Sequence, residues 1–503
     1  MKKLPALLAL AVILTLSSCK KDHFPFPENP RIDIDFYGLT VNNEIVKIEG
    51  KNVSRATNVT SITGLPSDAS IIAIDFRPAT GQLYGLGSNK RLYTINYTTG
   101  LASPIGEEPF ATELDGAMVG FDFNPTVDRI RLVTSLGKNL RLHPETGSLV
   151  AMDGTINPGG PQITAVAYCN SFAGATSTIL YDIDAHADKL YKQDPPNDGK
   201  LVEVGNLEVD FSGESGFDIS PDNKYALATL NEGNKYGSKQ KLYRIDLNKG
   251  KATLVCELDK PLIGLAIPTR PVAYAADLEN NLVIFDPMKI GTVIKKPFSG
   301  LQAGETVVGL DMRPATGQLY ALGSTNRLYA VNMSSGVASA ISTTPFSAVA
   351  AGVSYGFDFN PTVDRIRIVG SNGQNMRVHP VTGLLAAMDA NLNPGTPKIS
   401  AAAYTNSLAG ATSTTLFDID HMTGKLYKQD PPNDGKLVEV GSLGITITVS
   451  NGFDIGGTSN QGYALLSSGN STKLYGINLT TGKAEAKGVF PGKASAFTIG
   501  LGF

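Results

Sequence analysis

The sequence predicts an all-β protein, a β-propeller built from ten four-stranded units. Two observations predict it: the chain repeats itself with an offset of 236 residues, and each half contains a shorter period of 45 to 51 residues. Composition agrees, because 53 Gly residues and no Trp suit short strands joined by tight turns. Periods of this size are typical of propeller blades, solenoids or arrays.

The long repeat is carried by nearly identical segments in the two halves of the chain. Three pairs define the offset: Arg77–Tyr84 with Arg313–Tyr320, Gly120–Arg131 with Gly356–Arg367, and the unchanged 17 residues Lys189–Gly205 with Lys425–Gly441. We therefore expect two repeat regions, residues 33–268 and 269–503, joined by a short segment from Pro268 to Pro271.

The short period is a strand pattern in which Asp or a small residue lies between two apolar residues. Its ten middle positions are Asp75, Asp122, Ala167, Asp218, Ala266, Asp311, Asp358, Ala403, Asp454 and Gly502. One unit, residues 71–106, contains four apolar segments at 72–76, 83–86, 92–96 and 102–105, separated by turns rich in Gly, Asn and Thr. Such a unit is an antiparallel meander, as found in a propeller blade.

The two ends of each half can close a ring. In the first half, Ile263–Ile267 can pair with Tyr37–Val41, and the chain ends on an expected strand, Thr498–Phe503. Closure leaves no open sheet edge, which edge-strand physics favours. Five units make a plausible ring, so two five-bladed propellers are preferred; the alternative is one ten-bladed ring.

The N-terminus predicts export and lipidation. Lys2 and Lys3 precede an apolar run, Leu4–Leu16, that is too short to span a bilayer but suits a signal peptide. Leu16-Ser17-Ser18-Cys19 resembles the lipobox of bacterial lipoproteins. The expected segments are a signal peptide at 1–18, a lipidated Cys19 and a tether at 19–32.

The expected location is the cell envelope, with the lipid anchor in the outer membrane and its periplasmic or surface face left open. Lys20 follows the lipidated position, where an inner-membrane retention signal would usually carry Asp. The formal charge is −3, and −5 without Lys2 and Lys3, with no basic block, so nucleic acid is not an expected partner. Cys169 and Cys256 lie in different units and have no counterparts, so no disulfide framework is expected.

One predicted blade carries a charged face. Side chains alternate along a strand, so Phe, Ile and Leu occupy one face and polar residues the other. The polar set, with its repeat in the second half, is Asp122, Asn124, Arg129, Arg131, Asn139, Arg141, His143, Asp358, Asn360, Arg365, Arg367, Asn375, Arg377 and His379. Unpaired buried charge is costly, so this face must be paired, hydrated or occupied.

Two interpretations of the charged face are open. The preferred one is a structural ion-pair network between blades, with Asp75, Asp182 or Asp184 as acceptors. The other is a pocket for an anionic or polyhydroxy ligand, because Arg forks suit carboxylate and phosphate groups.

Two strings carry a family resemblance: Gly120-Phe-Asp-Phe-Asn-Pro-x-x-Asp-Arg-Ile-Arg131 and Asn139-x-Arg141-x-His143-Pro-x-x-Gly147. They resemble the signature of bacterial domain of unknown function 4394. Each half of the chain resembles one copy, and the resemblance covers nearly all of the mature protein. It implies no activity.

We expect a non-catalytic binding or scaffold lipoprotein with an unidentified small-molecule, glycan or protein ligand and no cofactor or metal. The chain has no His-Glu-x-x-His, Gly-x-Ser-x-Gly or Walker motif, and Asp194–Gly199 is predicted to be a hairpin turn. The alternative is a propeller glycosidase or another carbohydrate-active protein. A glycosidase needs two or three carboxylates at the channel mouth. The first-strand residues Asp75, Asp122 and Asp218 are interpreted as structural. A quinone-cofactor propeller has no specific support.

Overall fold

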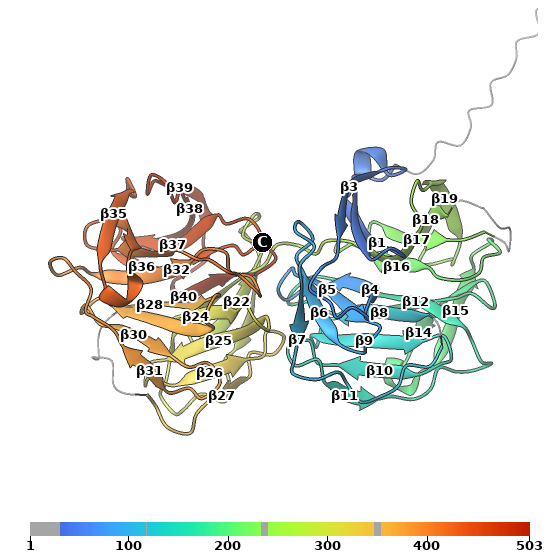
Figure 1. The fold of residues 1–503 in the computed structure, drawn as a ribbon, viewed down its shortest axis with the longest axis horizontal. Coiled ribbons are helices and arrows are strands. Elements are labelled where there is room, and N and C mark those ends of the chain that lie inside the picture. Colours follow the sequence, from blue (N-terminus) through green and yellow to red (C-terminus); the bar gives the residue numbers. More distant parts are fainter. Residues whose placement is uncertain (1–30, 117, 233–239, 347–353) are drawn as a thin grey trace, which may run out of the picture.

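The computed structural model describes residues 31–116, 118–232, 240–346 and 354–503. Within these residues, forty strands and three single-turn 3-10 helices, η1 (Gly50–Asn52), η2 (Pro196–Asp198) and η3 (Pro432–Asp434), make up the regular structure. The strands form ten four-stranded sheets, here called blades 1 to 10. Figure 1 shows them in two lobes side by side, the N-terminal half in blue to green and the C-terminal half in yellow to red.

The first lobe contains blades 1 to 5, each given from its inner strand outward. Blade 1 is β20 (Leu262–Ala266), β1 (Phe36–Thr40), β2 (Glu44–Ile48) and β3 (Ala56–Ser61). Blade 2 is β4 (Ile71–Phe76), β5 (Leu83–Gly87), β6 (Leu92–Ile95) and β7 (Ala102–Ile105). Blade 3 is β8 (Val119–Asn124), β9 (Arg129–Thr134), β10 (Asn139–Leu142) and β11 (Leu149–Met152). Blade 4 is β12 (Ile163–Tyr168), β13 (Leu180–Asp184), β14 (Lys189–Gln193) and β15 (Leu201–Asn206). Blade 5 is β16 (Gly216–Ile219), β17 (Ala226–Leu230), β18 (Lys241–Ile245) and β19 (Ala252–Glu257).

The second lobe repeats this plan in blades 6 to 10. Blade 6 is β40 (Ala494–Ile499), β21 (Ala273–Asp277), β22 (Asn281–Phe285) and β23 (Val293–Pro297). Blade 7 is β24 (Val307–Arg313), β25 (Gln318–Gly323), β26 (Leu328–Val331) and β27 (Ala338–Ala340). Blade 8 is β28 (Tyr355–Asn360), β29 (Arg365–Gly370), β30 (Asn375–Val378) and β31 (Leu385–Met388). Blade 9 is β32 (Ile399–Tyr404), β33 (Leu416–Asp420), β34 (Lys425–Gln429) and β35 (Leu437–Ser442). Blade 10 is β36 (Val449–Ile455), β37 (Gly462–Ser468), β38 (Ser471–Ile477) and β39 (Ala484–Val489).

Each lobe is a closed ring of five blades. The inner strands contact one another in the cycle β4, β8, β12, β16, β20 in the first lobe and β24, β28, β32, β36, β40 in the second. Both rings close by pairing the last strand of the half with its first: Ala266 lies opposite Tyr37, and Ile499 lies opposite Ala273. The chain therefore forms two five-bladed propellers, the arrangement that the sequence favoured over one ten-bladed ring.

The position of the last strand corrects one expectation. The sequence pattern predicted a strand at Thr498–Phe503, whereas β40 ends at Ile499. Gly500 N still donates to the Val272 carbonyl beside β21 at 2.8 Å, and Gly502 N then donates to the Thr80 carbonyl of the first lobe at 2.9 Å. Figure 1 accordingly shows the C-terminus between the two lobes. The middle residue of this inner strand is thus Thr498, not Gly502.

Apolar side chains fill the spaces between neighbouring blades. Between blades 2 and 3, the rings of Tyr84 and Phe123 meet edge to face with centroids 5.1 Å apart. The equivalent rings of Tyr320 and Phe359 in the second lobe also lie 5.1 Å apart. Offset ring pairs of this kind contribute about 0.5–1.5 kcal/mol beyond their buried area. The duplicated sequence thus produces the same core contacts twice.

The predicted signal peptide, Cys19 and residues 19–30 of the tether lie outside the described residues. Cys169 and Cys256, which are within them, are both free thiols. Among the described residues, the helices are too short and too polar to cross a membrane.

Candidate functional site

The charged face predicted from sequence lies on blade 3 and points toward blade 4. Strand register places Asp122 opposite Arg131, and Arg131 opposite Arg141, so the three side chains share one face. Blade 4 lies against them, because the main-chain N–H of Tyr168 donates to Asp122 Oδ1 at 3.0 Å. The alternation of side chains was therefore sufficient to predict this face.

Arg131 is enclosed at the centre of this interface, with only 2% of its surface exposed. Its Nη1 donates to Asn139 Oδ1 at 2.6 Å and to Asp153 Oδ2 at 2.7 Å. Its Nη2 donates to Asn197 Oδ1 at 2.7 Å, and its Nε to the Tyr168 hydroxyl at 3.4 Å. Arg131 thus connects blades 3 and 4, and most of its N–H groups have partners within the protein.

Asp153 is the carboxylate acceptor of the network, and it was not among the acceptors predicted from the sequence. Arg141 donates to both Asp153 oxygens, from Nε to Oδ2 at 2.7 Å and from Nη2 to Oδ1 at 2.8 Å. Burial raises the pKa of Asp153, but the hydrogen bonds from Arg141 and Arg131 outweigh that effect and hold the pKa below its usual value. Such forked, charge-assisted pairs are the stronger hydrogen bonds of proteins.

The acceptors proposed from sequence, Asp75, Asp182 and Asp184, were wrong. Asp75 and Asp184 accept main-chain N–H groups instead, and Asp182 has no hydrogen-bond partner within the described structure. Asp153 takes their place because it directly follows β11 and lies beside Asn139, to whose carbonyl its N–H donates at 2.8 Å. The recurrence of Ala151-Met152-Asp153 at 387–389 was the available signal.

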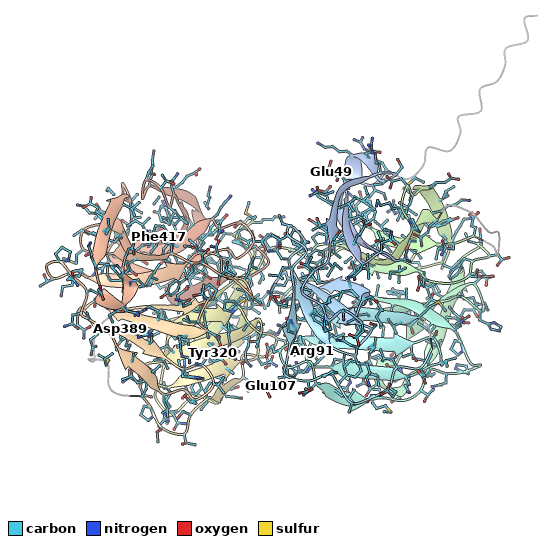
Figure 2. The ribbon with its side chains drawn as sticks, in the orientation of Figure 1. Glu49, Arg91, Glu107, Tyr320, Asp389 and Phe417 are labelled. Carbon is cyan, nitrogen blue, oxygen red and sulfur yellow. The ribbon has the colours of Figure 1, made fainter. Side chains whose placement is uncertain are left out.

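The second lobe reproduces this arrangement on blade 8. Arg367 Nη1 donates to Asn375 Oδ1 at 2.7 Å and to Asp389 Oδ2 at 2.6 Å, and Nη2 donates to Asn433 at 2.8 Å. Arg377 donates to both Asp389 oxygens, from Nε to Oδ2 and from Nη2 to Oδ1, each at 2.8 Å. Figure 2 labels Asp389 on this lobe.

The amides of the charged face fix turns. Asn139 Nδ2 donates to the carbonyls of Gly154 at 3.1 Å and Pro196 at 2.9 Å, which ties the Asp194–Gly199 segment to blade 3. That segment connects β14 to β15 through η2, as the predicted hairpin turn. Asn124 Oδ1 accepts from the main chain of Thr126 at 2.9 Å. Their second-lobe counterparts are Asn375, bonded to the Ala390 and Pro432 carbonyls, and Asn360, bonded to Thr362.

The remaining members also bond to nearby main chain. Arg129 Nη1 donates to the Asp128 carbonyl at 2.7 Å, and His143 Nδ1 accepts from Glu145 N at 3.3 Å. Burial, with the charges of Arg129 and Arg77, lowers the pKa of His143 to about 4, so His143 is neutral at pH 7. Arg365 and His379 make the equivalent bonds to Asp364 and Val381.

The first-strand aspartates tie neighbouring blades together near each axis. Asp75 accepts from Phe123 N at 2.8 Å, Asp122 from Tyr168 N, and Asp218 from Ile267 N at 2.6 Å. Burial raises the pKa of all three. The second lobe repeats the ties from Asp311, Asp358 and Asp454 to Phe359, Tyr404 and Ile499.

Open hollows lie elsewhere, over the fifth blade of each lobe, and the first also extends onto blade 4; we call them the fifth-blade grooves. The first has a volume of about 730 Å³, and its lining includes Asn170, Tyr181, Asn223, Lys224, Arg244 and Asp246. The second has a volume of about 540 Å³, and its lining includes Asn460, Tyr463, Asn478, Lys483, Glu485 and Lys487. Both combine amides, amines and an aromatic ring, a lining suited to polar ligands.

These features define a double five-bladed β-propeller whose charged blade faces are internal. The chain belongs to the family described as Domain of unknown function (DUF4394), which matches residues 44–266 and 281–500. No curated protein matches the chain.

Solved structures with a similar arrangement are distant in sequence. One is PorZ, described as an essential bacterial surface component of the type-IX secretion system of Porphyromonas gingivalis, at 12% identity and TM-score 0.26. The alignment covers 92% of this chain but only 59% of PorZ. The Dos1 propeller is 12% identical with TM-score 0.27, covering 68% of this chain and 87% of that one. A putative 6-phosphogluconolactonase from Bacteroides fragilis is 14% identical with TM-score 0.26, covering 69% and 96%.

Proposed function

We propose that the protein is a non-catalytic binding lipoprotein of the cell envelope, anchored in the outer membrane through Cys19. The observation that carries the binding role is the division of its polar groups. The polar groups of the charged face bond to one another and to the neighbouring blade, and Arg131 is only 2% exposed. The open polar surface lies in the fifth-blade grooves, so we assign ligand contact to them.

The buried carboxylates argue against glycoside hydrolysis. A glycosidase presents two carboxyl groups to the sugar, about 5–9.5 Å apart depending on mechanism. Asp75, Asp122 and Asp218 do converge, but each is at most 3% exposed and accepts main-chain N–H groups. A sugar ring cannot reach them without separating the blades.

The first groove is the better candidate for a polyhydroxy or anionic ligand. Arg244 donates through Nη2 to the Lys224 carbonyl at 3.0 Å, which holds two cationic side chains beside the groove. Asn223 and Asn170, which also line the groove, bond to each other at 2.6 Å. Fixed amides beside a guanidinium provide directed donors for hydroxyl or carboxylate oxygens.

A glycan array of neutral and acidic oligosaccharides, probed with the soluble chain from Lys20 onward, tests this function. We expect binding that Lys224→Ala combined with Arg244→Ala weakens at least about tenfold, the loss of one good charged hydrogen bond or more. Lys189→Ala, which removes a cation outside the groove, is the matched control. Release of sugar products during incubation, or binding unaffected by the groove variants, would contradict the proposal.

A further inference from the structure

A separate cavity lies between the two lobes, and we call it the junction pocket. It has a volume of about 340 Å³. Its lining includes Phe172 and Ala173 from the loop that follows β12, Arg270 from the segment that joins the lobes, and Ile284 and Ile294 from blade 6. Ligand pockets are common between domains and measure roughly 300–1,000 Å³, so this one has the size for a small ligand.

The apolar walls of the junction pocket are held in place by direct contact between the lobes. Ala173 and Ile294 pack against one core cluster, to which Ile284 belongs with 2% of its surface exposed. The main chain at Gly174 comes so near Ile294 that a Cβ there would lie 2.8 Å from Ile294 Cδ1. Walls that exist before the ligand arrives lower the entropic cost of binding, since little must be ordered.

Arg270 supplies the positive charge of the pocket, as the only cation among the described residues of its lining. Its guanidinium carbon lies 4.6 Å from the centroid of the Phe172 ring, within the range of a cation–π contact. Its Nη2 donates to the Pro221 carbonyl at 3.3 Å. Within the described part of the chain it forms no ion pair, and this includes Asp286 of the same lining. A guanidinium held in this way can offer two parallel N–H groups to a carboxylate.

The duplication shows that this pocket belongs to the first lobe alone. Residues Asn170–Thr178 and Asn406–Thr414 differ at one position, where Phe172 corresponds to Leu408. In the second lobe this loop is engaged by the first lobe, since Ser103 Oγ donates to the Ala409 carbonyl at 3.3 Å. The cavity beside Leu408 has a volume of about 30 Å³, room for about one or two water molecules. The loop therefore borders a larger pocket only where it carries the aromatic ring beneath Arg270.

We propose that the junction pocket binds a small monocarboxylate with an apolar body, of the fatty-acid type. The carboxylate accepts from Arg270, and the apolar body packs against Ile284 and Ile294. Asp286 lies in the same lining, where it repels a second negative charge, so a monoanion is favoured over a dianion. The inference is independent of the proposed function, because the pocket shares no lining residue with the fifth-blade grooves.

Titration calorimetry of the chain from Lys20 onward, with sodium octanoate as the probe, tests the inference. We expect one site with a Kd of roughly 0.1–1 mM, a range suited to a ligand of about ten non-hydrogen atoms. Octan-1-ol, which has the apolar body without the charge, should bind at least about tenfold more weakly, and so should octyl phosphate, which is a dianion near pH 8. Acetate, which has the charge without the body, should give no heat.

Arg270→Gln should weaken octanoate binding at least about tenfold while it leaves octan-1-ol binding unchanged, because only the charged contact is lost. Phe172→Leu gives the loop the sequence that folds in the second lobe, and it removes the ring beneath Arg270. We expect this variant to weaken octanoate binding by about two- to fivefold, the value of an exposed cation–π contact. Arg55→Gln, which removes an exposed cation outside the pocket, is the matched control and should bind octanoate like the native chain.

The inference is overturned if the native chain gives no heat with octanoate up to about 10 mM, or if Arg270→Gln binds it with native affinity. Tighter binding of octyl phosphate than of octanoate would overturn the choice of a monocarboxylate. Loss of octanoate binding in the combined Lys224→Ala and Arg244→Ala variant, but not in Arg270→Gln, would place the ligand in the first fifth-blade groove and overturn it equally.

Discussion

Removing the Arg131 guanidinium tests whether the charged face holds blades 3 and 4 together. Arg131→Ala deletes the four hydrogen bonds to Asn139, Asp153, Asn197 and Tyr168. Breaking a buried ion pair costs about 3–5 kcal/mol, because the abandoned partner stays buried. Here Asp153 keeps the fork from Arg141, and Asn197 is exposed and turns to water. The lower end, about 3 kcal/mol, is therefore expected.

The assay is thermal unfolding followed by circular dichroism. A lobe of this size loses about 2–4 °C per kcal/mol, so Arg131→Ala should lower the melting temperature of the first propeller by roughly 6–12 °C. Arg367→Ala should do the same to the second propeller, because its bonds are equivalent.

Arg141→Ala is the matched control for this experiment. The Arg141 side chain is 30% exposed, and its removal leaves Asp153 paired with Arg131. A loss of about 1 kcal/mol or less is expected for such a partly exposed pair. Melting temperatures that are unchanged or raised in both Arg131→Ala and Arg367→Ala would refute the ion-pair network. They would favour the alternative interpretation, a ligand pocket.

Three further outcomes are expected. Residues 31–268 alone should melt cooperatively as a monomer, because β20 closes the ring on β1; an obligate dimer by sedimentation would contradict this. Burial raises the pKa of Asp182 to about 8 against the weaker effect of Arg131. A raised carboxyl pKa adds stability that is complete below the unfolded value and lost as pH rises, so the unfolding free energy should fall from about pH 4 to 8 by up to about 1.4 kcal/mol per unit. Because burial also raises the pKa of Asp418 to about 8, Asp182→Asn should lessen that slope without removing it in denaturant titrations, and an unaltered slope would exclude this origin. Finally, Cys19→Ala should move the protein from the membrane to the soluble fraction on cell fractionation, since the lipid is the expected anchor; retention at the membrane would contradict lipidation.

Local pattern was enough to predict the blades and the charged face, because both depend on alternation within adjacent strands. The unit at 71–106 was predicted almost to the residue, as β4 to β7 show. Features that depend on ring closure could not be predicted in this way. The side chains of Asp75 and Asp218 meet only because β4 and β16 both border one axis. The end of β40 was predicted wrongly because the residues after it bond to the other lobe, where Gly502 N donates to the Thr80 carbonyl.

Sequence identity between the halves also hid a difference in environment. Arg77 and Arg313 begin the same eight-residue string, and each forks onto one aspartate, Asp128 or Asp364. Arg77, however, has a fully buried side chain and also contacts Glu145, whereas the Arg313 side chain is 16% exposed. The position that corresponds to Glu145 in the second half is Val381.

That replacement gives the first lobe a carboxylate that bonds to the second lobe. Glu145 accepts from Gln318 Nε2 of the second lobe at 3.0 Å, and Arg77 Nη1 donates to the Gly317 carbonyl at 3.1 Å. These bonds use turns that both halves possess, but only the first half supplies the carboxylate. The carboxylate of Glu145 therefore adds to the other bonds between the lobes, which include Gly502 N to the Thr80 carbonyl at 2.9 Å and Ser103 Oγ to the Ala409 carbonyl at 3.3 Å.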